Sequence, residues 1–118
     1  MTPGEVLEAW LAAWENDDRA GLHVLFPPDS TLHAVEPPEL RGDYRGLDGA
    51  AEYFRRKTEL LGDKFRWEAG DILEAGPYAV IPFKLFTIDE GLRQWWQLAI
   101  YRVVDGHIAE AWLFEEPG

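Results

Sequence analysis

The sequence changes character at Gly62, and this change restricts the fold more than any other feature. Before Gly62, apolar residues recur at the three- and four-residue spacing of amphipathic helices. After it, long runs rich in apolar and aromatic residues are separated by turns that contain glycine. These runs cover residues 64–75, 77–88, 92–104 and 107–115. Helices followed by a meander of strands predict an α+β domain with the helices on one face of the sheet.

The helical part opens with a start signal. Thr2-Pro3-Gly4-Glu5 has the pattern of a capping box, with proline at the first helical position. Val6, Trp10 and Trp14 then fall on one face of a helix. After Asn16-Asp17-Asp18 we expect a short helix ending at Pro27, a strand over 30–35 and a loop over 36–46. A third helix is expected over 48–61. This helix buries Ala51, either Tyr53 or Phe54, and Leu60.

Two local signals shape the predicted sheet. Asp105-Gly106 between apolar runs predicts a tight hairpin between the last two strands. Pro82 lies inside the second run and cannot donate a ladder hydrogen bond, so we expect a bulge or a sheet edge there. Strands of this length twist, and we expect the sheet to curl.

The charge balance limits the classes of partner. The 118 residues, which fit a single domain over 1–118, carry 11 Lys and Arg against 22 Asp and Glu, a net charge of −11. We find no basic stripe and expect no nucleic acid or membrane as partner. The sequence has no cysteine, which excludes disulfides and thiolate catalysis. With no signal-peptide pattern and no apolar run as long as a membrane span, we expect a cytoplasmic protein.

The strands carry apolar side chains on both faces. Trp95 and Trp96 are adjacent, as are Trp112 and Leu113, so one residue of each pair must point away from the helices. A large exposed apolar patch usually marks a partner surface. We therefore expect a homodimer formed through the outer face of the sheet.

Three stretches carry a family resemblance. They are AWLAAWENDDRAGLHVLFPPDSTLHA, LRGDYRGLDGAAEYFRR with its G-x-Y-x-G pattern, and YRVVDGHIAEAWLFEE with its R-x-x-D-G-x-I-x-E-x-W pattern. In this order they resemble the nuclear transport factor two-like superfamily, and within it the SnoaL-like and ketosteroid isomerase-like branch. The resemblance implies a cone-shaped, cystatin-like fold, with three N-terminal helices packed on the concave face of a strongly curved, mixed but mostly antiparallel sheet. It also implies a cavity between the helices and the sheet, and no cofactor.

The catalytic residues of this branch do not follow from the resemblance. Ketosteroid isomerase uses an aspartate base, with a tyrosine and a protonated aspartic acid that stabilise the enolate. Ungapped matching places Trp10 at the tyrosine, Ala34 at the base and Ala99 at the protonated acid. The last-strand aspartate of the limonene-epoxide-hydrolase and polyketide-cyclase branches falls at Leu113, or at Trp112 if the register slips by one. We therefore expect none of these reactions.

Glu110 is one remaining candidate for acid–base catalysis. If the last strand points Glu110, Trp112 and Phe114 inward, burial beside aromatic rings raises the pKa of Glu110 and suits it to this role. The opposite parity points Ala111 and Leu113 inward and leaves Glu110 in water. A register error of one residue reverses the answer.

His33 is the second candidate, because it lies next to the matched base position and histidine transfers protons near neutral pH. A histidine at a strand end is otherwise surface-exposed or bonded to backbone. His23 and His107 form no H-x-H or H-x-x-E pattern with it, so we expect no metal site.

The aromatic residues indicate a ligand cavity. The predicted ligand-binding residues are Trp10, Trp14, Tyr53, Trp67, Trp112 and Phe114. For any single one, ordinary core packing is the alternative. The leading hypothesis is a domain that binds a small hydrophobic molecule. The alternatives are a cofactor-independent isomerase, lyase or hydrolase using general acid–base chemistry, and a non-catalytic dimeric association module.

Overall fold

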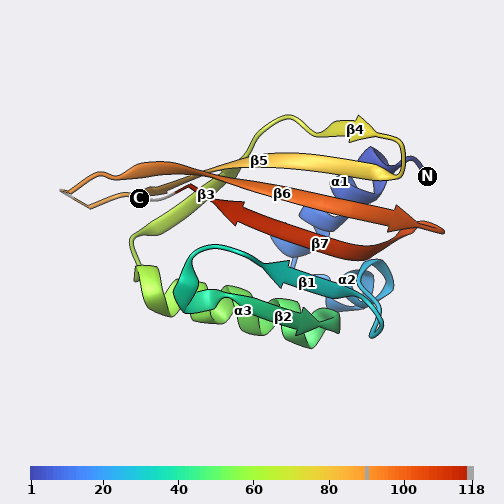
Figure 1. Cartoon of the computed structure of the whole chain (residues 1–118), viewed down its shortest axis with the longest axis horizontal. Helices are drawn as coiled ribbons and strands as arrows, with labels where there is room; N and C mark the ends of the chain where they lie inside the picture. Colours follow the sequence, from blue (N-terminus) through green and yellow to red (C-terminus); the bar gives the residue numbers. More distant parts are fainter. Residues whose placement is uncertain (90, 117–118) are drawn as a thin grey trace.

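The computed structural model describes residues 1–89 and 91–116, and its helices precede most of its strands, as the sequence predicts (Figure 1). The helices are α1 (Pro3–Glu15), α2 (Arg19–Leu25), the short 3-10 helix η1 (Pro38–Leu40) and α3 (Gly46–Leu61). The strands are β1 (Thr31–Ala34), β2 (Gly42–Arg45), β3 (Phe65–Ala69), β4 (Leu73–Ala75), β5 (Tyr78–Thr87), β6 (Gln94–Val104) and β7 (His107–Glu115).

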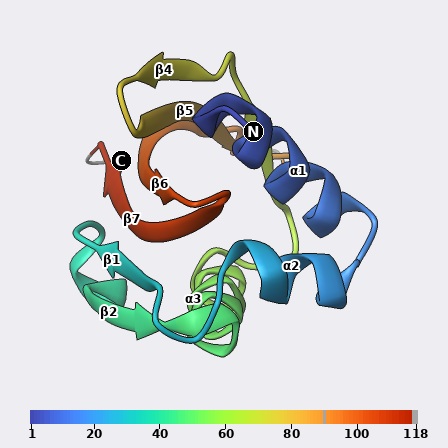
Figure 2. The ribbon, with the colours of Figure 1, turned by 90° about the vertical axis from the view of Figure 1, so that its right-hand side faces the viewer.

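The strands form one curved, mixed sheet. Their order is β2-β1-β7-β6-β5-β3, and β4 also pairs with β5. Strands β1 and β7 are parallel, whereas the other neighbours are antiparallel. Figure 2 shows the strands curling around, with α1, α2 and α3 along the open side of the curl. The predicted α+β cone fold, with helices on the concave face of a mostly antiparallel sheet, is confirmed.

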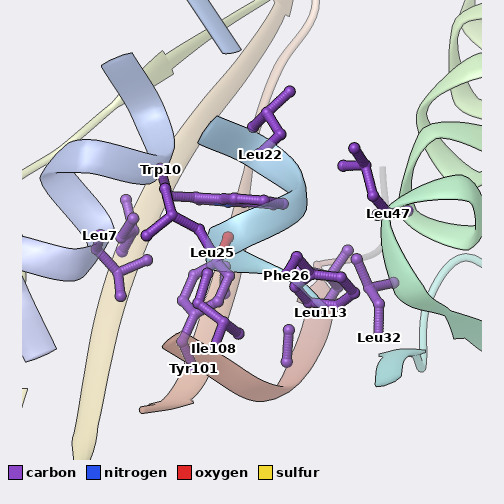
Figure 3. Close-up of a cluster of buried hydrophobic side chains, with 14 of the residues drawn as sticks. Leu7, Trp10, Leu22, Leu25, Phe26, Leu32, Leu47, Tyr101, Ile108 and Leu113 are labelled. Carbon is purple, nitrogen blue, oxygen red and sulfur yellow. The ribbon is translucent and has the colours of Figure 1, made fainter. Parts of the chain in front are cut away.

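The hydrophobic core lies between the helices and the concave face (Figure 3). Leu7 and Trp10 of α1 and Leu22 of α2 pack in the same cluster as Ile108 and Leu113 of β7. The adjacent tryptophans of β6 separate as expected, because Trp95 is buried and Trp96 is exposed. Alternate residues of each long strand therefore form the core and an outer face.

Both local signals at the ends of the chain are present. Thr2 Oγ1 accepts from the Glu5 backbone N–H at 3.2 Å, and Glu5 Oε1 accepts from the Thr2 backbone N–H at 2.8 Å, which completes the capping box. Asp105 and Gly106 have φ values of 50° and 78°, the left-handed conformation that a tight hairpin turn requires. These two signals are local, so tertiary packing did not alter them.

The expected bulge or edge at Pro82 is found on one side of β5 only. Pro82 lies within β5 in regular register with Leu98 of β6, and β3 and β4 pair along the other side of β5. The predicted run over 64–75 breaks there into β3 and β4, and Gly70 donates its backbone N–H to the Pro82 carbonyl at 2.7 Å. The proline nitrogen faces the same side as that carbonyl, at the break between two strands, so no ladder hydrogen bond is lost.

Helix α3 differs from the prediction in its start and its buried face. It begins at Gly46, directly after the strand β2 that occupies part of the expected loop. Leu60, expected in the core, is 47% exposed, whereas Lys57 is buried. The buried face runs through Ala50, Tyr53 and Lys57 because these positions are three and four residues apart.

Candidate functional site

A cavity of about 310 Å³ lies between α1, α3 and the concave face of the sheet. Ligand pockets in proteins have volumes of about 300–1,000 Å³, so this one has the size for a small organic molecule. Its lining residues are Trp10, Leu11 and Trp14 of α1, Phe54, Lys57 and Thr58 of α3, and Phe65, Trp67, Phe83, Leu85, Gln97, Tyr101 and Leu113 of the strands.

Aromatic rings packed edge to face form much of the wall. The rings of Trp10 and Trp14 lie 5.4 Å apart at 85°, and those of Trp14 and Phe54 lie 5.2 Å apart at 76°. On the strands, Trp67 and Phe83 also line the cavity, and their ring centroids are 5.6 Å apart at 78°. These are favourable aromatic geometries, so each ring restricts the movement of its neighbour. The result is an apolar wall with a defined shape.

One part of the lining is polar. Lys57 Nζ donates to Glu115 Oε1 at 2.5 Å and to the Tyr53 hydroxyl at 3.2 Å. Gln97 Nε2 donates to the same hydroxyl at 3.1 Å. Lys57 and Gln97 both line the cavity, and Lys57 is only 3% exposed. An otherwise apolar cavity therefore borders a buried ion pair.

Burial sets the protonation behaviour of this polar part. Burial lowers the pKa of Lys57, and the hydrogen bond and charge of Glu115 oppose this shift without cancelling it. Burial raises the pKa of Tyr53, against the effect of its hydrogen bond with Gln97. Burial also raises the pKa of Tyr101, against the effect of Trp10. Both phenols therefore remain neutral at physiological pH.

The indole N–H of Trp14 is a buried donor without an acceptor. Its Nε1 has no hydrogen-bond partner in the described part of the chain, although the atom is shielded from solvent. An unsatisfied buried donor destabilises a fold by about 1–3 kcal/mol. Trp14 lines the cavity through its ring, but its Nε1 has almost no accessible surface, so this N–H does not face the cavity.

The fold and cavity agree with the comparison against protein families. The family model of the SnoaL-like domain matches residues 7–111. The chain belongs to this family. No protein with a curated description matches this SnoaL-like domain in sequence.

Solved structures with the same fold share little sequence with this SnoaL-like domain. A protein of unknown function with a cystatin-like fold from Xanthomonas campestris is 21% identical, with a TM-score of 0.78 over 99% of this chain and 92% of that one. IdmH, a proposed polyketide cyclase from Streptomyces antibioticus, is 20% identical, with a TM-score of 0.73 over 98% and 93%. An LEH-like epoxide hydrolase from M. tuberculosis is 19% identical, with a TM-score of 0.65 over 97% and 82%. At these identities the likeness establishes the fold alone.

The positions matched to catalytic residues of the ketosteroid isomerase-like branch lie in the core of this SnoaL-like domain. Trp10 and Leu113 line the cavity, and Ala34 and Ala99 are buried. Leu113 therefore places an apolar side chain in the cavity at the position matched to the last-strand aspartate, whereas Ala34 and Ala99 are not among the lining residues. The polar lining residues of the cavity are Lys57 and Thr58 of α3 and Gln97 and Tyr101 of β6, and Glu115 near the end of β7 pairs with Lys57.

The six predicted ligand-binding residues divide between the two faces of the sheet. Trp10, Trp14 and Trp67 line the cavity, and Tyr53 reaches its polar part through the hydroxyl. Trp112 stacks on His33 with ring centroids 5.7 Å apart, and Phe114 is exposed. Trp112 and Phe114 do not line the cavity.

The last strand, β7, points Glu110 outward, which is the second of the two orientations considered in the sequence analysis. Ala111 and Leu113 are buried, and Glu110, Trp112 and Phe114 point to the outer face. The rise in the Glu110 pKa that was expected for the inward parity does not occur, because the side chain points outward. Hydrogen bonds from Arg102 and then His33 lower the pKa of Glu110, with Arg102 Nη2 at 2.8 Å.

His33 and Glu110 are brought together, but away from the cavity. His33 Nε2 lies 2.9 Å from Glu110 Oε2, and His33 Nδ1 lies 2.7 Å from Asp43 Oδ1. Partial burial disfavours the charged ring, but the bonds to the two carboxylates outweigh burial and raise the pKa of His33. Both ring nitrogens are engaged, as expected for a protonated histidine that links β1, β2 and β7.

Three further observations concern a second hollow, metal ligands and the helices. Glu110 and Arg102 border a shallow hollow of about 290 Å³ that also contains Arg45 and His107. Among residues 1–89 and 91–116, no group of three or more His, Cys, Asp and Glu side chains is placed to share a metal ion. Within the same residues, no helix has the length and apolar character needed to cross a membrane.

The sequence analysis missed Lys57 and Glu115 as members of the site. Lys57 belongs to a run of basic residues, and charged residues on a helix are normally solvated. The available signal was spacing: Lys57 is four residues after Tyr53, and Glu115 is two residues after Leu113, so each shares a face with a buried neighbour. Their pairing joins two elements 58 residues apart, which spacing alone does not predict.

Proposed function

We propose that this SnoaL-like domain binds a small, largely apolar molecule in the cavity between α1, α3 and the sheet. The observation that carries the proposal is the aromatic wall around about 310 Å³ of space, with few polar groups. IdmH and the M. tuberculosis epoxide hydrolase carry names of activities on small organic molecules, which is consistent with such a ligand.

The alternatives receive less support from the same features. An isomerase, lyase or hydrolase using Glu110 or His33 needs these side chains at the ligand, and neither lines the cavity. An association module with a solid core does not account for a cavity of ligand size. Binding of a small molecule therefore has the most direct support.

Trp67 and Trp96 provide a matched test. They are 44% and 45% exposed, but only Trp67 lines the cavity. We expect Trp67→Ala to weaken binding of 2-naphthol about tenfold, because a lost aromatic contact is worth roughly 1 kcal/mol or more. Trp96→Ala is expected to leave the affinity almost unchanged. Isothermal titration calorimetry measures both.

A companion measurement is mass spectrometry of small molecules released from the purified, denatured protein, since a tight apolar pocket retains its occupant. Equal affinities of the two tryptophan variants for 2-naphthol, together with no released molecule, would contradict the proposal.

We further propose that two copies of the chain associate through the outer face of the sheet. Tyr78, Trp96, Leu98 and Phe114 are large apolar side chains exposed on β5, β6 and β7. A second copy would cover this apolar surface. The cytoplasm is the proposed compartment, since a cysteine-free chain suits a reducing environment.

A further inference from the structure

We propose that Lys57 forms a covalent imine with aromatic aldehydes that enter the cavity. This inference rests on the proposed binding function, because the aldehyde must first occupy the apolar space beside Lys57. Lys57 would then be a reactive group in an otherwise apolar binding site.

The position of Lys57 distinguishes it from the other lysines. The sequence contains Lys57, Lys64 and Lys84 and no other lysine. Lys57 is 3% exposed and lines the cavity. Lys64 is exposed, and Lys84 forms a partly exposed ion pair with Glu68 at 3.0 Å. A carbonyl compound in the cavity therefore meets one amine.

The surroundings of Lys57 favour the reactive form of its amine. An amine attacks a carbonyl only when it is neutral, and desolvation of lysine in an apolar pocket promotes this form. Burial lowers the pKa of Lys57 despite the opposing effect of Glu115. The Glu115 carboxylate, 2.5 Å from Nζ, is placed to take the ammonium proton.

The reaction is balanced with groups that are present. Glu115 takes one proton from the Lys57 ammonium, and the Nζ lone pair then forms a bond to the aldehyde carbon. The carbonyl π pair moves to oxygen, which takes the proton back from Glu115. Glu115 next accepts a second proton from nitrogen and returns it to the hydroxyl, which leaves as water as the C=N bond forms. Ammonium and aldehyde become a protonated imine and water, Glu115 ends as the carboxylate it was at the start, and no oxidant or reductant is needed.

The test is reductive trapping on the intact protein. The protein is incubated with 2-naphthaldehyde and sodium cyanoborohydride near neutral pH, which converts any imine to a stable secondary amine. Peptide mapping by mass spectrometry then locates the label. We expect more label on Lys57 than on Lys64 and Lys84 together, loss of that label in Lys57→Arg, and its retention in the control Lys84→Arg.

A variant of Glu115 tests whether labelling of Lys57 depends on its ion pair and not only on how accessible the amine is. In Glu115→Gln the opposing charge is lost, so the Lys57 pKa falls further and half-maximal labelling moves to lower pH. The maximal rate of labelling falls, because the carboxylate that carries the protons is absent. The control Glu116→Gln changes the next carboxylate, which bonds the Trp96 backbone N–H, and is expected to leave the pH profile unchanged.

The outcomes distinguish this inference from the binding proposal. Calorimetric binding of 2-naphthol with no label on Lys57 overturns the imine and leaves binding intact. Failure of 2-naphthol to bind overturns both. Equal labelling of all three lysines in the unmodified protein also overturns the imine, and this readout does not require a variant to fold.

Discussion

At the scale of single residues, the Lys57–Glu115 pair has a large energetic consequence. Both side chains are almost fully buried, at 4% and 8% exposure. Removing one partner of a buried pair leaves the other charge without compensation in a medium of low polarity. The pair therefore constrains the end of β7 against α3 beside the cavity.

We expect Glu115→Ala to lower the free energy of unfolding by about 3 kcal/mol, because Lys57 is left buried and unpaired. The matched control is Glu68→Ala, which removes the acid of the partly exposed Lys84 pair and is expected to cost under about 1 kcal/mol. Urea denaturation of both variants measures the difference. Equal losses would mean that Glu115 is solvated in solution.

His33 and Glu110 show a second consequence at this scale. Both were predicted as catalytic candidates, and the register between β1 and β7 places them in contact on the outer face. His33 and Glu110 form an ion pair with each other. His33 also pairs with Asp43, and Glu110 with Arg102. The cavity is on the other side of the sheet from both residues. A catalytic role for either one stays an untested prediction.

At the scale of elements, the junction of β2 and α3 positions the helix that carries Phe54 and Lys57. Gly49 lies in the first turn of α3, where an added Cβ would be 2.7 Å from the Tyr44 carbonyl carbon. Real side chains do not approach a backbone atom so closely. The small residue is therefore required by packing, although alanine is the better helix former.

We expect Gly49→Ala to destabilise the protein by about 1–3 kcal/mol, because the methyl group forces α3 away from β2. Without this contact, the substitution would stabilise α3 through higher helix propensity. The control Glu59→Ala, on the exposed side of the same helix, is expected to change stability by under about 0.5 kcal/mol. Thermal unfolding compares the variants, and a higher melting temperature for Gly49→Ala would contradict the packing argument.

At the scale of the whole molecule, the curl of the sheet separates two apolar surfaces. The helices cover the concave surface (Figure 2). The cavity lies between these helices and the sheet. The outer surface of β5, β6 and β7 exposes Trp96, Leu98 and Phe114. The same chain therefore has one apolar face for a ligand and another for the proposed second copy.

Multi-angle light scattering tests the dimer. We expect twice the mass of one chain at micromolar concentration, and the mass of a single chain for Leu98→Arg, because a charge at the centre of the apolar face opposes its burial. Leu92→Arg makes the same change in the connection before β6, where Leu92 is exposed, and should remain dimeric. A monomeric unmodified protein would end the dimer proposal.

Much of the architecture could be predicted from the sequence because its signals are local. The capping box at Thr2, the Asp105-Gly106 turn and the alternation of buried and exposed residues along β6 depend on neighbours a few residues away. Together with the order of elements, they predicted an α+β domain with the helices on one face of the sheet. The cone shape, and the placing of Trp10, Trp14 and Trp67 at a cavity, followed from the family resemblance.

Only the tertiary structure decided what depends on contacts between distant elements. The parity of β7 is set by its register with β1 and β6, and it placed Trp112 and Phe114 outside and Leu113 inside. The burial of Lys57 depends on a carboxylate that arrives from the other end of the chain. Burial of a charged residue is tolerated where an oppositely charged partner lies beside it. The sequence contains both residues, but only the fold brings them into contact.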